Sequence, residues 1–122
     1  MNLIEKTERL MEECEASKTR FFQMRELDAA PHFFDEVKPH ADYIHQLLDE
    51  WKAEVIQWIF EHKPKYLHRM QIEHAVDAMN QFVVQSFYKE TSKKRFLQSV
   101  HSVHYTLSTL LRFLRGERAD EE

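Results

Sequence analysis

Along four separate segments of this chain, apolar residues recur in alternating steps of three and four, the spacing of a helix face that packs against other helices. The segments span roughly residues 2–26, 39–62, 68–89 and 93–115. The last is the most regular, with the row Phe96, Val100, Val103, Leu107, Leu110 and Leu114. Each predicted helix is about 30–36 Å long at ~1.5 Å per residue. Helices of matching length favour an all-α, four-helix bundle.

Turn-forming residues are scarce and stand between the predicted helices. The 122 residues include 1 glycine and 3 prolines, which disfavours a β-sandwich, a dinucleotide-binding α/β unit or a glycine-rich phosphate loop. Pro39 suits the first turn of the second helix, Pro64 ends that helix, and Gly116 follows the fourth. Short second and third connections predict antiparallel neighbours, and therefore up-down-up-down connectivity.

The first connection, residues 27–38, is the longest, and the Phe33-Phe34 pair within it predicts a short helical turn that packs against the bundle. At the other end of the chain, residues 117–122 are expected to form a frayed acidic tail. We therefore expect one four-helix domain over residues 1–116, followed by this tail.

Nothing in the sequence predicts export or a membrane. The stretch that follows Met1 has no apolar core of a signal peptide. No segment approaches the ~18 uncharged apolar residues that a membrane helix needs. Cys14 is the single cysteine, which excludes an internal disulfide and fits a reducing compartment. We therefore expect a cytoplasmic protein that does not enter a membrane.

Several short stretches resemble one known family. They are Lys63-Pro64-Lys65-Tyr66-Leu67-His68 followed by Gln71-Ile72-Glu73, and also Phe33-Phe34-Asp35-Glu36-Val37-Lys38-Pro39, Gln85-Ser86, Lys93-Lys94-Arg95-Phe96 and Tyr105-Thr106-Leu107. In order and spacing they resemble the YppE-like family of small proteins from Bacillus-type bacteria. The resemblance implies a four-helix up-and-down bundle with no established biochemical activity. It carries over no catalytic or binding residue.

Eight histidines raise the question of a metal-dependent enzyme. A di-iron helical bundle needs inward-facing Glu residues and two Glu-x-x-His pairs, and this chain has no Glu-x-x-His. The nearest spacings, Asp42 to His45 and His101 to His104, project mostly away from the apolar rows at ~100° per residue. The thiol of Cys14 lies on an apolar row, where a cysteine is usually buried and inert. We therefore predict no cofactor and no catalytic residue, and keep a metal-dependent enzyme using these surface histidines as an alternative.

Charge is divided unevenly along the chain, with a net charge of −7 over residues 1–61 and +3 over residues 62–122. The basic half holds two clusters, Lys63, Lys65, His68 and Arg69 at the second connection and Lys89, Lys93, Lys94 and Arg95 at the third. Consecutive connections lie at opposite ends of an up-down-up-down bundle, ~30 Å apart. One continuous nucleic-acid stripe is therefore disfavoured.

The cations at the third connection stand in the first turn of the fourth helix, where they oppose the helix dipole. Together with free backbone N–H groups, Lys93, Lys94 and Arg95 predict a site for an anion, a nucleic acid or an acidic partner. The alternatives are that the acidic second helix balances these charges, or that the fourth helix begins later in the chain.

Aromatic residues divide into two groups. Trp51 and Trp58 lie on the apolar row of the second helix, which predicts core packing, and His62 is the one histidine on such a row. Phe60 and Phe113 project away from their rows near the same end of the bundle, and predict a patch covered by a connection, a partner or a second copy.

Our leading interpretation is a non-enzymatic interaction or adaptor protein that binds an unidentified protein or a second copy through its helix faces. Its alternatives are the metal-dependent enzyme and the anion or nucleic-acid site at the start of the fourth helix.

Overall fold

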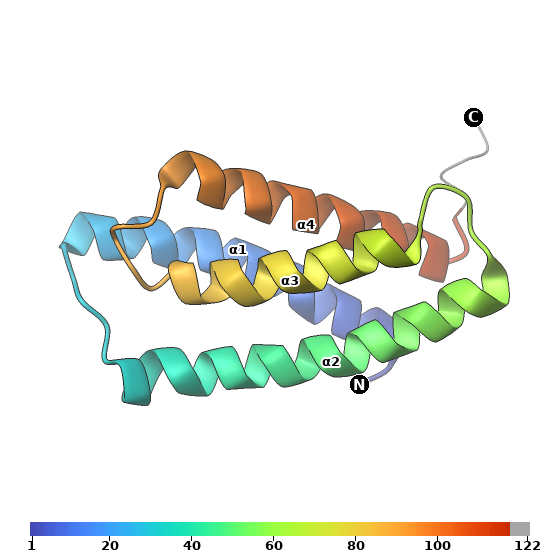
Figure 1. Ribbon diagram of the computed structural model, residues 1–122, viewed down its shortest axis with the longest axis horizontal. Coiled ribbons are helices and arrows are strands. Elements are labelled where there is room, and N and C mark those ends of the chain that lie inside the picture. Colours follow the sequence, from blue (N-terminus) through green and yellow to red (C-terminus); the bar gives the residue numbers. More distant parts are fainter. Residues whose placement is uncertain (118–122) are drawn as a thin grey trace.

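The structure is a computed structural model, and it describes residues 1–117. This part of the chain contains four long helices and one π-helical turn (Figure 1). The helices are α1 (Leu3–Leu27), α2 (Lys38–His62), α3 (Arg69–Gln85) and α4 (Lys93–Leu114), and the π-helical turn η1 (Phe33–Val37) directly precedes α2. The predicted acidic tail lies outside the described residues, apart from Glu117.

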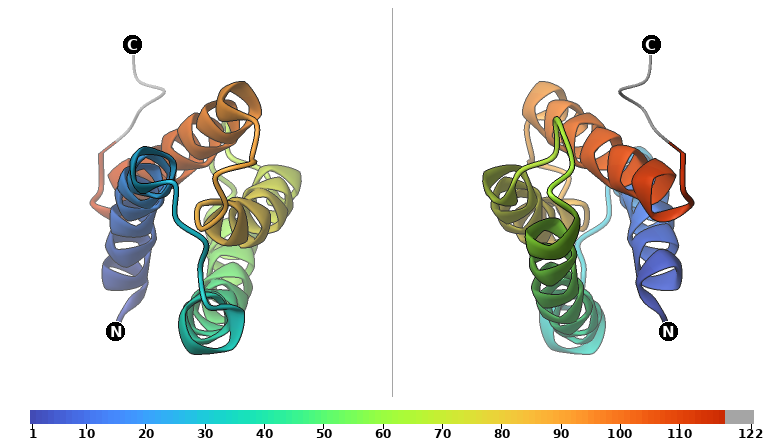
Figure 2. Two further views of the ribbon diagram at one scale, coloured as in Figure 1. Left: turned by 90° about the vertical axis from the view of Figure 1, so that its left-hand side faces the viewer. Right: turned by 90° about the vertical axis from the view of Figure 1, so that its right-hand side faces the viewer.

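The four helices form an antiparallel bundle in which each runs opposite to the next (Figure 1). Seen end-on, α1 lies beside α2 and α4, and α3 also lies beside α2 and α4 (Figure 2). No strand occurs among residues 1–117. The prediction of an all-α, up-down-up-down four-helix bundle with a long first connection is therefore confirmed.

Local chemistry sets the ends of the helices. Asn2 caps α1: its side chain accepts a hydrogen bond from the N–H of Glu5 at 2.8 Å, and the Glu5 carboxylate accepts one from the N–H of Asn2 at 2.9 Å. Pro39 lies in the first turn of α2, and Ser92 caps α4. Gly116 follows α4 with a φ of 82°, in the left-handed region that favours glycine.

The predicted apolar rows form the core. At its centre the rings of Phe21 and Phe96 stack at 4.2 Å, and Phe82 packs edge-on against Phe96 at 6.1 Å. Trp51 is fully buried, and its indole N–H donates to the Thr7 hydroxyl at 3.0 Å. A buried indole N–H needs such a partner, so Thr7 does more than fill a narrow layer of the core.

The third helix ends earlier than the sequence predicts, at Gln85 rather than near residue 89. The N–H groups of Phe87 and Tyr88 donate to carbonyls three residues back, those of Val84 and Gln85. Hydrogen bonds that span three residues instead of four tighten the last turn and end the α-helix. No glycine or proline marks this end in the sequence.

The first connection contains the predicted helical turn, but its aromatic pair does not pack inward. Within η1 only Val37 is buried, whereas Phe33 and Phe34 are 47% and 77% exposed. The two rings instead pack edge-on against each other at 5.2 Å. The turn therefore packs against the bundle through Val37, and its aromatic pair stays largely exposed.

Polar contacts join α1 to α2, an interface that we call the α1–α2 seam. The Lys6 amine, 11% exposed, donates to the Glu54 carboxylate and lies 3.5 Å from that of Glu50. The hydrogen bond to Glu54 raises the pKa of Lys6, against burial, which lowers it. A second and more deeply buried contact crosses the same seam near the start of α2.

Candidate functional site

A buried carboxylate lies at the α1–α2 seam. The Glu13 side chain of α1 is 1% exposed, and its Oε2 accepts a hydrogen bond from His40 Nε2 of α2 at 2.8 Å. Ser17 donates to the same oxygen at 3.2 Å, and the guanidinium groups of Arg20 and Arg9 lie 3.4 and 3.5 Å from the carboxylate. Four side chains therefore surround one buried negative charge.

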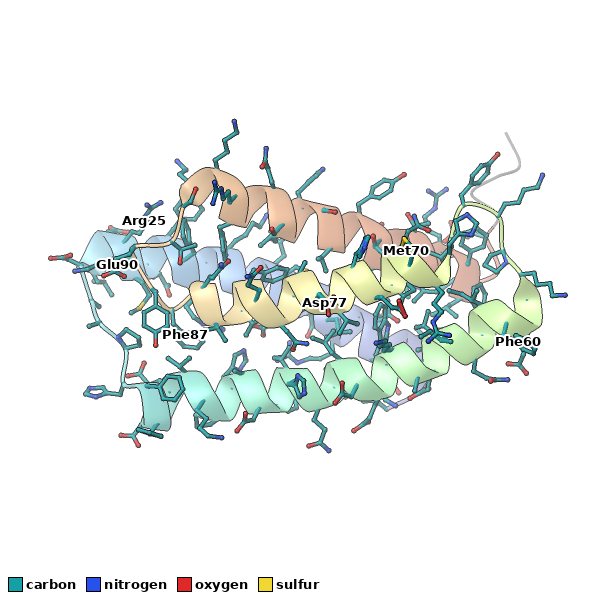
Figure 3. All side chains as sticks on the ribbon, viewed as in Figure 1. Arg25, Phe60, Met70, Asp77, Phe87 and Glu90 are labelled. Atoms are coloured by element: carbon teal, nitrogen blue, oxygen red, sulfur yellow. The ribbon has the colours of Figure 1, made fainter. Side chains whose placement is uncertain are left out.

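The cluster extends to the end of α3. Arg20 donates to the Ser86 hydroxyl at 2.8 Å, and that hydroxyl donates to the Val83 carbonyl at 2.6 Å. The Arg20 guanidinium also lies 4.5 Å from the ring centre of Phe87, which sits between the end of α3 and the start of α2 (Figure 3). One arginine thus ties three helices together.

Electrostatics holds Glu13 in its ionised form. Burial would raise the pKa of the carboxyl, but the hydrogen bond from His40 and the charges of His40, Arg20 and Arg9 outweigh it, so the pKa is lowered from 4.5. The carboxylate oxygens are occupied by these partners, which is the arrangement of a structural ion cluster. The apolar rows of the sequence do not predict this cluster, since Glu13 lies beside the row of α1 and not on it.

The basic cluster at the third connection lies where predicted, in the first turn of α4, which holds no acidic residue. The Ser92 hydroxyl accepts from the N–H of Arg95 at 3.5 Å, and the Lys93 amine lies 5.6 Å from the ring centre of Phe22. Lys94 is exposed. The anion site at Lys93, Lys94 and Arg95 stays a prediction.

The second connection shapes two surface cavities at the opposite end of the bundle. Lys63 and Lys65 line the larger one, of about 490 Å³, together with Trp58, His62 and Phe113. Here His62 is exposed and its ring stacks on Trp58 at 4.8 Å, while Trp58 itself packs against the edge of the core. Trp58 is half-buried.

The smaller cavity, of about 190 Å³, adjoins the first because Phe113 lines both. Its other walls include the rings of Tyr66 and Tyr105 and the guanidinium of Arg112. We call the residues around the two cavities the aromatic–basic end; they are Trp58, His62, Lys63, Lys65, Tyr66, Tyr105, Arg112 and Phe113.

His68 does not join this group. It is the N-cap residue of α3, and its backbone N–H donates to the Gln71 side chain at 2.6 Å in a capping box. It lines neither of the two cavities. Of the predicted cluster at the second connection, the structure brings only Lys63 and Lys65 together with the aromatic rings.

Phe60 and Phe113 lie at the same end of the bundle, as predicted. Phe60 is 74% exposed at the end of α2 (Figure 3) and lines neither cavity. Phe113 is half-buried against the core, because the Trp58 ring covers it at a centroid distance of 6.2 Å. Phe113 therefore packs against the core more closely than its position on α4 predicts, and a patch that includes Phe60 and Phe113 stays a prediction.

The histidines do not gather. Within residues 1–117, no group of three or more His, Cys, Asp or Glu side chains is placed to hold a metal ion. Across the same residues, no helix combines the length and the apolar character needed to cross a membrane. The metal-dependent alternative therefore receives no support from the described part of the chain.

Comparison with known proteins places these features in a family. Residues 7–114 match a bacterial domain of unknown function, DUF1798. The uncharacterized protein YppE of Bacillus subtilis (strain 168) is 32% identical over 105 residues, which cover 86% of this chain and 85% of that protein. The resemblance to the YppE-like family is therefore confirmed.

Solved structures agree with the sequence match. The crystal structure of YppE from Bacillus subtilis superposes with a TM-score of 0.90 at 30% identity, over 93% of each chain. A protein of unknown function from Listeria innocua superposes with a TM-score of 0.89 at 28% identity, over 95% of this chain and 93% of its own. This chain therefore belongs to DUF1798, a bacterial family of unknown function.

Proposed function

We propose that this chain is a non-enzymatic protein–protein interaction module, and that its binding surface is the aromatic–basic end. The observation that carries the proposal is the convergence of aromatic rings and cations around two adjoining cavities at one end of the bundle. Aromatic residues and arginine are enriched at the positions that carry most of the energy of protein interfaces.

Backbone conformation supports the same surface. Tyr66 has a φ angle of 64°, in the left-handed region that residues with a Cβ rarely adopt except at helix ends, where Asp28 and Lys63 adopt it as C-cap residues. Strain of this kind, about 1–3 kcal/mol per residue, concentrates at binding and active sites. Tyr66 lies outside any helix, in the connection that shapes the cavities, so its strained conformation falls at the proposed binding surface.

The Glu13 cluster, the most buried group of ionisable side chains described above, supports a non-enzymatic role because its carboxylate is already paired and is not available to a substrate. Glu13 is surrounded by the partners described above, and Cys14 is a buried thiol. A lone reduced cysteine also supports a cytoplasmic location, since such a thiol needs no oxidising compartment.

A photo-crosslinking amino acid placed at either of two exposed aromatic positions tests the proposal inside the cells that make this chain. Tyr105, 68% exposed, lies at the aromatic–basic end, and Phe34, 77% exposed, is a matched control at the opposite end of the bundle. We expect a discrete crosslinked product from position 105 and none of the same mass from position 34. Charge reversal by Lys65→Glu should weaken the product at position 105.

The mass of the product distinguishes a different protein from a second copy of this chain. Equal products from both positions, or no product from position 105 after efficient photolysis, would contradict the proposal. The melting temperature of each variant, measured by circular dichroism, shows that loss of the product does not follow from unfolding.

A further inference from the structure

The smaller cavity of the aromatic–basic end continues into a groove between α3 and α4. Three residues, Gln71, Tyr105 and Thr106, line both the smaller cavity and this groove of about 460 Å³. Small side chains line much of the groove: Ala75, Ala78, Ser99 and Ser102. From Gln98 to Arg112 along α4, cavity and groove together extend ~21 Å at 1.5 Å per residue.

Charge is distributed very unevenly along this surface. Residues 96–111 of α4 include no Asp, Glu, Lys or Arg, although 31% of the whole chain is charged. Arg112 follows directly and lines the smaller cavity. Arg69 of α3 and Arg115, three residues further along the chain, pair with Glu73 and Glu8 at 3.0 and 2.6 Å, whereas Arg112 has no carboxylate partner within residues 1–117.

We propose that this surface binds a segment of a partner protein that places one carboxylate against Arg112 and lays uncharged residues along the α3–α4 groove. The inference rests on the proposed function and names the chemistry of the partner. A planar guanidinium binds a carboxylate through paired hydrogen bonds. The rings of Tyr66 and Tyr105 border that contact and exclude water from it.

A carboxylate fits the smaller cavity better than a phosphate does. Among the described residues that line it, one guanidinium is the only cationic side chain, and the remaining polar groups are amide and hydroxyl groups, as in Gln71, Thr106 and Thr109. A phosphate carries up to two charges and is usually bound by several cations. Lys63 and Lys65 line the neighbouring cavity, where they attract an acidic segment without contacting its carboxylate.

The rest of the segment is uncharged in this proposal, because no Asp, Glu, Lys or Arg among the described residues lines the groove, and its one histidine, His74, is exposed to water. Its small side chains let a partner backbone approach closely, as in grooves that accept a helix. A length of ~21 Å corresponds to about fourteen helical residues or about six extended ones.

A phage-displayed library of random peptides of about fourteen residues, which covers both conformations, tests the inference. The library is selected against the wild-type chain and, separately, against Arg112→Glu. Tyr105→Ala removes one wall of the cavity and identifies peptides that use this surface. Arg112 is exposed, so its variants are expected to keep the wild-type melting temperature.

We expect the wild type to enrich Asp or Glu at one fixed position and Arg112→Glu to enrich Lys or Arg there. Arg112→Gln should weaken a selected acidic peptide about tenfold or more. Two results would overturn the inference: peptides that depend on Tyr105 but show no acidic preference, or an acidic preference that is unchanged in Arg112→Glu. Neither result would contradict the proposal that the chain is an interaction module. Failure to select any peptide that depends on Tyr105 would also overturn the inference, whereas the crosslinking experiment alone decides the interaction module.

Discussion

The Nε2 of His40 lies 2.8 Å from the Oε2 of Glu13, and this contact joins the start of α2 to the middle of α1 through a carboxylate that water barely reaches. Removing the carboxylate leaves the His40, Arg20 and Arg9 side chains facing one another without an acceptor. We therefore expect Glu13→Ala to lower the free energy of unfolding by about 2–3 kcal/mol. Urea unfolding measures the change. Glu12→Ala is the matched control, since Glu12 is exposed and its loss should cost no more than about 0.5 kcal/mol.

The same carboxylate should make stability depend on acid pH. Its folded-state pKa lies below 4.5, so the stabilisation by ionised Glu13 is complete above the unfolded pKa and is lost as the pH falls through the lower folded pKa. We expect the free energy of unfolding of the wild type to fall more steeply than that of Glu13→Gln as the pH is lowered below 4.5. Urea titrations at several pH values measure both slopes. Parallel curves would show that Glu13 carries no shifted pKa.

The thiol of Cys14 should be unreactive while the chain is folded. Burial, together with the charges of Glu13 and Glu15, raises its pKa to about 12. At about pH 8 roughly one thiol in ten thousand is then ionised, and only the thiolate attacks disulfide reagents. We expect labelling in native buffer to be slow, and fast labelling in denaturant. An exposed thiol introduced by Thr19→Cys in a Cys14→Ser background should react rapidly without denaturant, which rules out an inactive reagent.

Tyr66 should lower the free energy of unfolding through its backbone conformation and contribute its ring to binding at the aromatic–basic end. Its φ of 64° costs a residue with a Cβ about 1–2 kcal/mol, which glycine avoids at the expense of some chain entropy. We expect Tyr66→Gly to raise the free energy of unfolding by about 0.5–1 kcal/mol and to reduce crosslinking at position 105. Tyr66→Ala loses the ring but keeps the Cβ, so it should reduce crosslinking without the gain in stability. A Tyr66→Gly variant that is less stable than the wild type would refute the assignment of strain.

The bundle could be predicted from the sequence because its signal is local. The row from Phe96 to Leu114 repeats over adjacent turns, and the ends marked by Pro39 and Gly116 depend on the conformational preferences of single residues. The end of α3 at Gln85 could not be predicted, because it depends on backbone hydrogen bonds to carbonyl groups in a turn that contains no glycine or proline.

The Glu13 cluster had only a weak signal in the sequence. Lys6, Glu13 and Arg20 are spaced by seven residues, so they share one side of α1 next to the apolar row. Nothing local tells a buried carboxylate there from a solvated one, because the deciding partner, His40, lies 27 residues away in the chain. The meeting of Tyr66 with Arg112 at one cavity likewise depends on how α3 and α4 pack.

The polar contacts of the α1–α2 seam restrict how these two helices can slide past each other. Trp51 reaches the hydroxyl of Thr7 at 3.0 Å, and His40 reaches Glu13 at 2.8 Å. A slip of one helical turn, ~5.4 Å, would part both pairs and strand an indole N–H and a carboxylate in a dry interior. Apolar side chains alone would tolerate such a shift far better. Directional hydrogen bonds therefore select a single longitudinal alignment of the two helices, which hydrophobic packing alone would leave undetermined.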